Sequence, residues 1–332
     1  TEALSRAISE DCGYAVWYGP ASEDTLDLLE RQGFVRAELP SRQPLLLVDM
    51  RSPSVLLQNI PTTLKEPFSS YRTVLAAVRA AHCRMQRALT GLYPGSLILS
   101  LNAEVIYHRL VRKIVDLNGV PAEPTVPRVL GPKMCVPFGK ILRGNAIPNT
   151  VTKTLHADKV YAANRESFSI LEAPGYSSLS GQVRTIKAFR RPVILVDDLL
   201  HWGHRIHALD HIFKEERVEI RSIVVGLMSG QGRDLMLTQG QTVDCEYFIP
   251  NLNHWLTESS LYPFIGGDSI DRPEEFSWKR PSINMILPYV NPTFLPGSDD
   301  KTRIRLSKAV LENARDILAA LERRHLETFT TA

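Results

Sequence analysis

The chain has 332 residues, 44% of them hydrophobic, so it can bury a substantial core in one large domain or in two. A formal net charge of +3, without basic residues interleaved with aromatic ones, argues against a nucleic-acid platform. No apolar run approaches about 18 residues, so neither a transmembrane helix nor a membrane partner is expected, and no signal peptide is recognised. Four scattered cysteines without a CxxC pair favour reduced thiols in a cytoplasmic protein.

Residues 1–50 predict a β-α-β-β cap. Strands are expected at 14–18, 34–39 and 45–49, and Ser22 followed by two acids is typical of a helix start. The run TLDLLERQGFVRAELP resembles the closing segment of the GNAT-superfamily N-acetyltransferases. The acetyl-CoA pyrophosphate loop of that family has no counterpart upstream, so this part is either a remnant of such a domain or an unrelated cap. The chain starts at Thr1, as expected for a fragment or a processed product.

The next part of the chain predicts a connector and then the beginning of a sheet. Residues 51–66 are punctuated by prolines, and a helix ending near Leu92 follows. The run SLILSL at 96–101 predicts the first buried strand of the core sheet, with a helix after it, and a second strand is expected within 127–138. Residues 139–180 are polar and rich in turns, which indicates a long loop or a surface hairpin.

The chain is centred on the stretch 191–213, RPVILVDDLLHWGHRIHALDHIF. Its apolar run at 193–196 is typical of a strand buried on both faces of a parallel sheet. Asp197 and Asp198 follow at once, and a short loop leads through Gly203 to a segment with helical spacing. Ligands bind at the carboxyl ends of such strands, and a helix N-terminus favours phosphate. This arrangement suits a ligand with hydroxyls at one end and a phosphate at the other.

Residues 193–206 resemble the phosphoribosyl-pyrophosphate (PRPP) motif of the type I phosphoribosyltransferases, which has four apolar residues, two acids, two more apolar residues and a Thr/Gly-rich loop. The resemblance implies that Asp197 and Asp198 face the ribose hydroxyls, and that the loop backbone wraps the 5-phosphate. In that loop only Gly203 matches the family. Bulky residues stand where small or hydroxyl residues are usual, namely His201, Trp202, His204 and Arg205.

The same resemblance implies further site residues. The family's pyrophosphate loop follows the first core strand, which would place it on Ser100, Leu101, Asn102 and Ala103. The mobile loop of the family would supply Lys153 as a catalytic cation for the leaving group and His156 as a proton donor, with Arg128 and Lys133 as weaker candidates. A hood over the base would include Phe248, Trp255 and Tyr262 for stacking, and Asn251, Asn253 and Glu258 for its edge. Mg²⁺ would arrive with the ligand and contact Asp197 and Asp198 only weakly.

Two other patterns in the sequence bear on function and assembly. His204, His207 and His211 share one face of the expected helix and are an alternative structural zinc site. Residues 271–332 predict a strand at SINMILPYV and a terminal helix, whose apolar stripe packs on the body or on a second subunit. A homodimer is therefore compatible with the sequence.

The fold class expected is α/β, with a parallel sheet, helices on both faces and α+β extensions at both ends. Four segments are expected: a cap at 1–50, a connector and helix at 51–95, a core with its hood at 96–270, and a strand and helix at 271–332. The expected function is phosphoribosyl transfer to or from a nucleobase-like acceptor, on PRPP or a nucleoside monophosphate, with Mg²⁺. A non-catalytic PRPP or nucleotide sensor and a structural scaffold are the alternatives. No motif identifies the acceptor or establishes catalysis.

Overall fold

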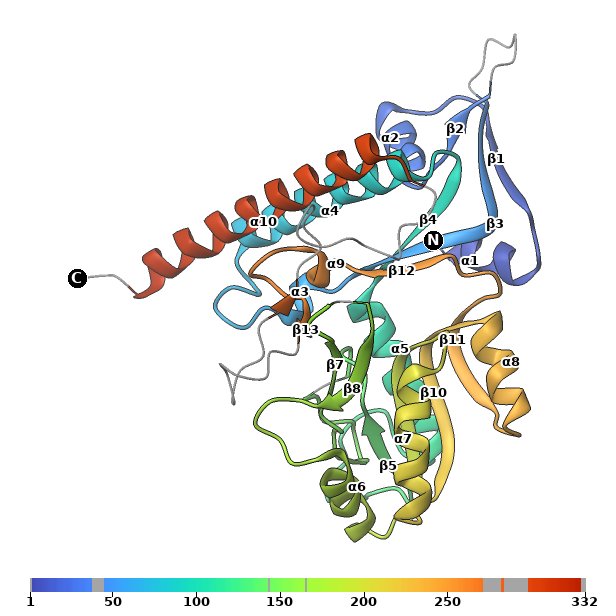
Figure 1. The fold of residues 1–332 in the computed structure, drawn as a ribbon, viewed down its shortest axis with the longest axis vertical. Coiled ribbons are helices and arrows are strands. Elements are labelled where there is room, and N and C mark those ends of the chain that lie inside the picture. The colour runs from blue at the N-terminus through green and yellow to red at the C-terminus, as the bar shows by residue number, and fades with distance from the viewer. Residues whose placement is uncertain are drawn as a thin grey trace. The chain divides into compact units, whose positions relative to one another are not determined.

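The computed structural model describes residues 2–37, 45–142, 144–164, 166–270, 282–283 and 298–329. The chain divides into two compact units (Figure 1). Unit 1 comprises Thr1–Ala103, Asn251–Gly267 and Ser282–Ala332, and unit 2 comprises Glu104–Pro250 and Asp268–Pro281. Both units are therefore assembled from separate stretches of the chain, which the four expected segments do not capture.

Unit 2 is built on a five-stranded sheet in the order β11-β10-β9-β5-β6, and all its described pairings are parallel. The strands are β5 (Met134–Pro137), β6 (Val151–Thr152), β9 (Val193–Leu200), β10 (Ile220–Ser229) and β11 (Val243–Ile249). The motif strand β9 lies at the centre, flanked by β5 and β10. This confirms the expected α/β class with a parallel sheet.

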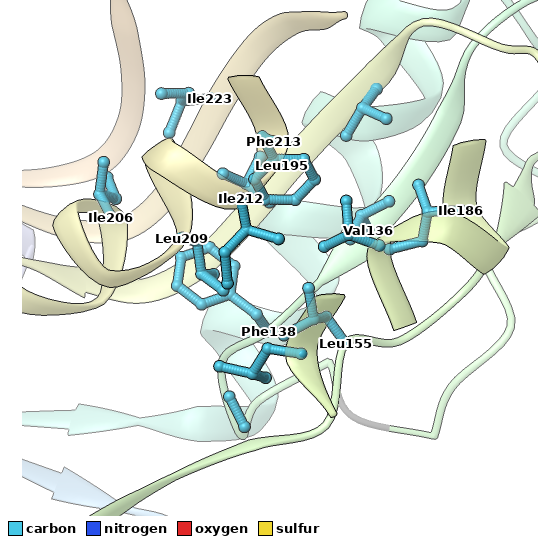
Figure 2. Close-up of a cluster of buried hydrophobic side chains, with 14 of the residues drawn as sticks. Val136, Phe138, Leu155, Ile186, Leu195, Ile206, Leu209, Ile212, Phe213 and Ile223 are labelled. Atoms are coloured by element: carbon cyan, nitrogen blue, oxygen red, sulfur yellow. The ribbon is translucent and has the colours of Figure 1, made fainter. Parts of the chain in front are cut away.

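Helices cover both faces of this sheet. They are α5 (Ala103–Asn118), α6 (Leu179–Ala188), α7 (His204–Glu215) and α8 (Gly230–Thr238). Side chains of α6 and α7 pack with Leu195 and Ile223 in one buried cluster (Figure 2). Successive strand residues point to opposite faces, so Gly226 faces away from that cluster. There α5 approaches so closely that a Cβ on Gly226 would lie 2.9 Å from the Cγ2 of Ile106.

The polar segment 139–180 contains a hairpin. Its strands β7 (Ala157–Tyr161) and β8 (Phe168–Glu172) pair antiparallel, and β13 (Asp268–Ile270) adds to β7 in parallel. The hairpin is one of the two forms that the sequence indicated for this segment. Its closure over a ligand stays a prediction.

Unit 1 is organised by one long strand, β3 (Leu45–Gln58). The first half of β3 pairs antiparallel with β1 (Tyr14–Tyr18) and β2 (Val35–Arg36), which with α2 (Glu23–Arg31) confirms the β-α-β-β order. Its second half pairs parallel with β4 (Ser96–Asn102) and β12 (His254–Thr257). Residues 51–58 therefore belong to a strand, and the expectation of a connector is wrong for this part of 51–66. Pro53 is tolerated within β3 because the register shifts there, between Asp49 and Ser54.

The expected place of the 96–101 strand is also wrong. It forms β4, which pairs with β3 in unit 1, whereas the described neighbours of β9 in unit 2 are β5 and β10. A short apolar run is equally compatible with any buried strand position, so its composition could not select the sheet. The first strand of the sheet that contains the acid pair is β5.

Two long helices complete the core of unit 1. α4 (Arg72–Leu92) and α10 (Asp300–Phe329) pack against each other, as Figure 1 shows, and they share one buried apolar cluster. This confirms the terminal helix, and its stripe, which includes Val310 and Ile317, packs on the body of the unit. The remaining elements are α1 (Glu2–Ser9), α3 (Ile60–Thr63), α9 (Glu258–Leu261) and β14 (Ser282–Ile283). The strand expected at 34–39 ends on residues 38–39, and most of the strand expected at SINMILPYV falls on residues 284–290. Both stretches lie outside the described residues. In the described part of the chain, no helix combines the length and hydropathy needed to span a bilayer.

Candidate functional site

Two buried acids lie near the carboxyl end of the central strand of unit 2. Asp197 and Asp198 belong to β9, and they are only 2% and 8% exposed. As neighbours on a strand they point to opposite sides of it. Buried carboxylates without partners are very costly, so the contacts of each acid decide what it can do.

Asp198 is held by the turn that follows β5. Its two carboxylate oxygens accept hydrogen bonds from the backbone N–H groups of Lys140 and Ile141, at 2.6 and 3.0 Å. Gly139 makes this approach feasible, because a Cβ there would lie 2.3 Å from the Oδ1 of Asp198. The turn over 138–141 thus presents backbone amides beside the acid pair. Sequence reasoning missed it, although the Gly-Lys directly after an apolar strand was the available signal.

Asp197 forms an ion pair with the first turn of α7. Its Oδ1 accepts from the Nη1 of Arg205 at 2.6 Å and from the backbone N–H of Asp198 at 2.7 Å. Burial raises the pKa of Asp197 to about 6, opposed by the charge of Arg205 and reinforced by that of Asp198. The negative charge of Asp197 in turn raises the pKa of Arg205. Arg205 therefore neutralises one of the two acids within the site.

The loop between β9 and α7 depends on Gly203. This residue has a φ of +71°, and a Cβ there would lie 2.2 Å from the Cδ2 of Leu235. α7 begins at the next residue, so its N-cap is Gly203, which has no side chain to cap the helix. The backbone N–H groups of the first helical turn lie at this edge of the sheet, where a helix N-terminus favours an anion.

The bulky loop residues lie around this helix start. The Nδ1 of His201 is 2.7 Å from the Oγ of Ser229, at the end of β10, and burial lowers the pKa of His201. Trp202 is 60% exposed. The ring of His204 lies edge-on to the ring of Phe168 of the hairpin, with the ring centroids 5.0 Å apart. Burial lowers the pKa of His204, and the charge of Lys159 lowers it further. Both imidazoles are therefore mainly neutral at neutral pH.

Lys159 is a cation that sequence reasoning missed. It lies on β7, 4.3 Å from the ring centroid of Phe168, and its Nζ donates to the hydroxyl of Tyr161 at 2.5 Å. It also approaches Asp268 at 3.9 Å. The hairpin thus brings a lysine to His204 at the start of α7, which only the pairing of β7 with β8 reveals.

The other predicted cations are placed differently. Lys153 directly follows β6, and its backbone N–H donates to the carbonyl of Cys135 on β5. Since β5 lies between this segment and β9, the backbone of Lys153 is two strand spacings, or about 10 Å, from β9. Lys133 directly precedes β5, so it lies at the opposite end of the sheet from the acids. Its Nζ donates to the carbonyl of Leu117. Arg128 is exposed and also precedes β5, and the roles of Lys133 and Arg128 toward a ligand stay predictions. The ring of His156 stacks on Tyr176 with centroids 3.7 Å apart.

Several predicted site residues belong to unit 1, whereas Asp197 to Arg205 belong to unit 2. They are Ser100, Leu101, Asn102, Ala103 and Trp255. Their roles toward a ligand stay predictions. Tyr262 and Glu258 are buried within unit 1, so the expected contacts of these two side chains with a base are wrong. No group of three or more His, Cys, Asp or Glu among the described residues is arranged to hold a metal, and His207 and His211 are exposed on α7.

Comparison with known proteins adds little to this geometry. No protein-family model matches the chain, and no curated protein matches it significantly. Among solved structures, TT1426 from Thermus thermophilus aligns at 18% identity over 45% of this chain and 83% of its own, with a TM-score of 0.24. A mutant hypoxanthine phosphoribosyltransferase from Trypanosoma cruzi, in complex with its product IMP, aligns at 13% identity over 52% and 81%, with a TM-score of 0.26.

Proposed function

We propose that unit 2 binds PRPP or a ribose 5-phosphate nucleotide and transfers the phosphoribosyl group to or from a base. The observation that carries this proposal is the buried acid pair at the carboxyl end of the central parallel strand, followed directly by the uncapped N-terminus of α7. A parallel sheet binds ligands at this edge. A ribose 5-phosphate has hydroxyls at one end and a phosphate at the other, so it can contact the acids of β9 and the first turn of α7 together.

Each part of the ligand has a candidate partner. Asp197 and Asp198 offer acceptors to the ribose hydroxyls. The first turn of α7 offers backbone N–H groups to the 5-phosphate, and Arg205 can pair with it bidentately. The N–H groups of Lys140 and Ile141, which donate to Asp198 without a ligand, are further candidate partners of the pyrophosphate, which would replace Asp198 as their acceptor. Lys159 and Lys153 are candidate cations for the leaving group.

The chemistry asked of these residues is electrostatic. Transfer passes through a ribosyl cation-like transition state, and preorganised carboxylates stabilise the positive charge that develops there. Carboxylate oxygens are of the type that Mg²⁺ prefers. Asp197 already pairs with Arg205 and Asp198 with two amides, so the phosphates of the ligand would supply most of the magnesium ligands. The bound ion would neutralise charge on the pyrophosphate.

One observation favours a nucleotide sensor as the second candidate. Both acids already have partners within unit 2, so a ribose must compete with Arg205 or with the amides of the turn. A protein that binds and releases a nucleotide needs only this exchange, while an enzyme also needs an acceptor base beside the sugar. The sensor and the enzyme therefore share the binding site and differ in turnover.

Calorimetry tests the binding step, with PRPP, a nucleoside 5′-monophosphate and the matching nucleoside as ligands in the presence of Mg²⁺. We expect binding of the phosphorylated ligands and at least about tenfold weaker binding of the nucleoside, because an ionic phosphate contact contributes about 1.5–3 kcal/mol. Arg205→Ala should reduce that discrimination, whereas Arg233→Ala, on the exposed part of α8, should not. Absence of binding by every phosphorylated ligand contradicts the proposal. Binding without pyrophosphate release, across the common nucleobases, supports the sensor.

A further inference from the structure

Three residues of unit 1 form a continuous hydrogen-bonded line. The Oγ of Ser100 is 2.8 Å from the Nε2 of His82, and the Nδ1 of His82 is 3.0 Å from the Oε2 of Glu258. Ser100 comes from β4, His82 from α4 and Glu258 from α9. The histidine and the acid are 6% and 1% exposed, while the serine is half-buried near the carboxyl end of its strand. Of the three residues, His82 and Glu258 are buried and Ser100 is partly exposed.

The contacts of Glu258 indicate which ring nitrogen carries the proton in the neutral imidazole of His82. The Oε1 of Glu258 accepts from the hydroxyl of Tyr262 at 2.7 Å, and burial raises the pKa of Tyr262 well above its ordinary value, so this hydroxyl remains a donor. Asn313 of α10 donates to the same hydroxyl at 3.0 Å. A carboxylate held in this way accepts a proton donor on its second oxygen as well. The ring proton is therefore assigned to Nδ1, which leaves Nε2 as the acceptor that faces Ser100.

Two other serine–histidine contacts in the described part of the chain lack this order of atoms. The Oγ of Ser54 lies 3.1 Å from the Nδ1 of His254, whose Nε2 faces the hydroxyl of Tyr93 at 3.4 Å. His201 also meets its serine through Nδ1. Among the described contacts of these two histidines, none joins the second ring nitrogen to an acid. The arrangement around Ser100 is therefore specific, and Ser54 provides a matched comparison.

We propose that Ser100 is an activated nucleophile, with His82 as its general base and Glu258 as the orienting acid, in a site of unit 1 that acts on carboxylic esters. This activity goes beyond phosphoribosyl transfer and does not depend on it. Ordered serine, histidine and acid groups with these atom pairings recur on unrelated folds, and they are recognised by geometry. Because His82 and Glu258 are buried and Ser100 is half-buried, an ester must reach the three residues from the side of Ser100, which favours short acyl groups.

Each step of the reaction balances. The Oγ of Ser100 attacks the ester carbonyl carbon while its proton passes to the Nε2 of His82. The carbon–oxygen bond to the alcohol then breaks, and the leaving alkoxide takes that proton, which leaves an acyl-serine. A water molecule attacks the acyl carbon and gives its proton to the same nitrogen. The bond between the acyl carbon and the Oγ of Ser100 then breaks, and Oγ takes the proton back from Nε2. The carboxylic acid leaves, the serine hydroxyl is restored, and Glu258 keeps the imidazole oriented throughout.

The test uses the full chain and a fluorophosphonate probe, which bonds to an activated serine with loss of fluoride. Peptide mass spectrometry should find one phosphonyl group on Ser100. Ser100→Ala should abolish the adduct, Glu258→Gln should slow labelling by about tenfold or more, and Ser54→Ala should label at the rate of the unmodified chain. Thermal melts of all variants establish that they are folded.

Failure of the unmodified chain to label, or equal labelling of the Ser100→Ala variant, overturns the proposal. So does a folded Glu258→Gln variant that labels at the original rate. The comparison with Ser100→Ala holds even when the buried Glu258→Gln change prevents folding, because Ser100 is half-buried and loses a single hydroxyl. Hydrolysis of p-nitrophenyl acetate gives a second readout, with an initial burst of p-nitrophenol expected from the unmodified chain and none from Ser100→Ala.

Discussion

The carboxylate of Asp197 and the guanidinium of Arg205 form an ion pair with a distance of 2.6 Å between β9 and α7. The pair spans the loop that would hold the 5-phosphate. It therefore connects the two ends of the candidate site before any ligand arrives. A ligand that carries both a diol and a phosphate can replace each half of this pair with a contact of its own, which a nucleoside without phosphate cannot do.

The pH dependence of stability should report on Asp197. Its pKa is 3.8 ordinarily and about 6 in the folded protein. Between these values the folded protein holds this proton more tightly than the unfolded chain, so the contribution of Asp197 to the free energy of unfolding falls as the pH rises. Asp197→Asn removes that slope. Relative to the unmodified chain, we expect the variant to gain stability as the pH is raised from 4 to 7. Urea unfolding across this range measures it.

The exposed acid Asp234 supplies the control for this measurement, because its side chain is 68% exposed. Asp234→Asn removes one carboxylate without changing a buried site, so it controls for the loss of charge alone. Parallel stability curves for the Asp197→Asn variant and the unmodified chain would show that the burial of Asp197 does not perturb its titration.

Asp198→Asn should lower both stability and activity. Both oxygens of Asp198 accept from backbone N–H groups, and an amide offers only one acceptor in that place. We expect a loss of about 1–3 kcal/mol from the unpaired donor, and about 100-fold or more in the rate of pyrophosphate release. Asp244→Asn, on β11 and paired with Lys113, is the control and should change neither strongly. Normal unfolding and full turnover of the Asp198→Asn variant would leave the acid without the proposed role.

Gly139→Ala should displace the turn that holds Asp198. The added Cβ would lie 2.3 Å from the Oδ1 of Asp198 and 2.7 Å from its backbone nitrogen. Overpacking of this kind costs about 1–3 kcal/mol, and nucleotide binding should weaken with it. Gly91→Ala is the matched control, because nothing lies within 4 Å of a Cβ on that helical glycine. It should stabilise the protein by about 0.5–1 kcal/mol. Equal stability and binding in both variants would contradict the prediction.

Gly203→Ala should lower the free energy of unfolding for two reasons, a strained backbone and a clash with Leu235. Two further variants separate these contributions. The φ of +71° costs a side chain about 1–2 kcal/mol, and the Cβ would meet the Cδ2 of Leu235 at 2.2 Å. Adding Leu235→Ala removes the clash only, so the change from Gly to Ala should cost less in that background. Gly119→Ala, with a φ of +64° and nothing within 4 Å, measures the backbone effect alone. Equal costs of Gly203→Ala with and without Leu235 would exclude the clash.

The local pattern of the chain was sufficient to place the centre of unit 2. Four apolar residues, two acids and a glycine before helical spacing define strand, edge, loop and helix through short-range rules of periodicity and backbone freedom. The same rules identified the terminal helix, whose stripe needs only a regular 3.6-residue period. These features depend on neighbours in the sequence.

Which strands pair, and which side chains meet, was decided by the tertiary structure. The run SLILSL satisfies any buried strand position, so nothing local could assign β4 to β3 in unit 1 and leave β5 beside β9. His82 meets Glu258 across 176 residues of sequence, and the turn at 138–141 meets Asp198 across 57 or 58. Such contacts follow from the packing of whole elements, since hydrophobic burial rewards apolar area without specifying which partner supplies it.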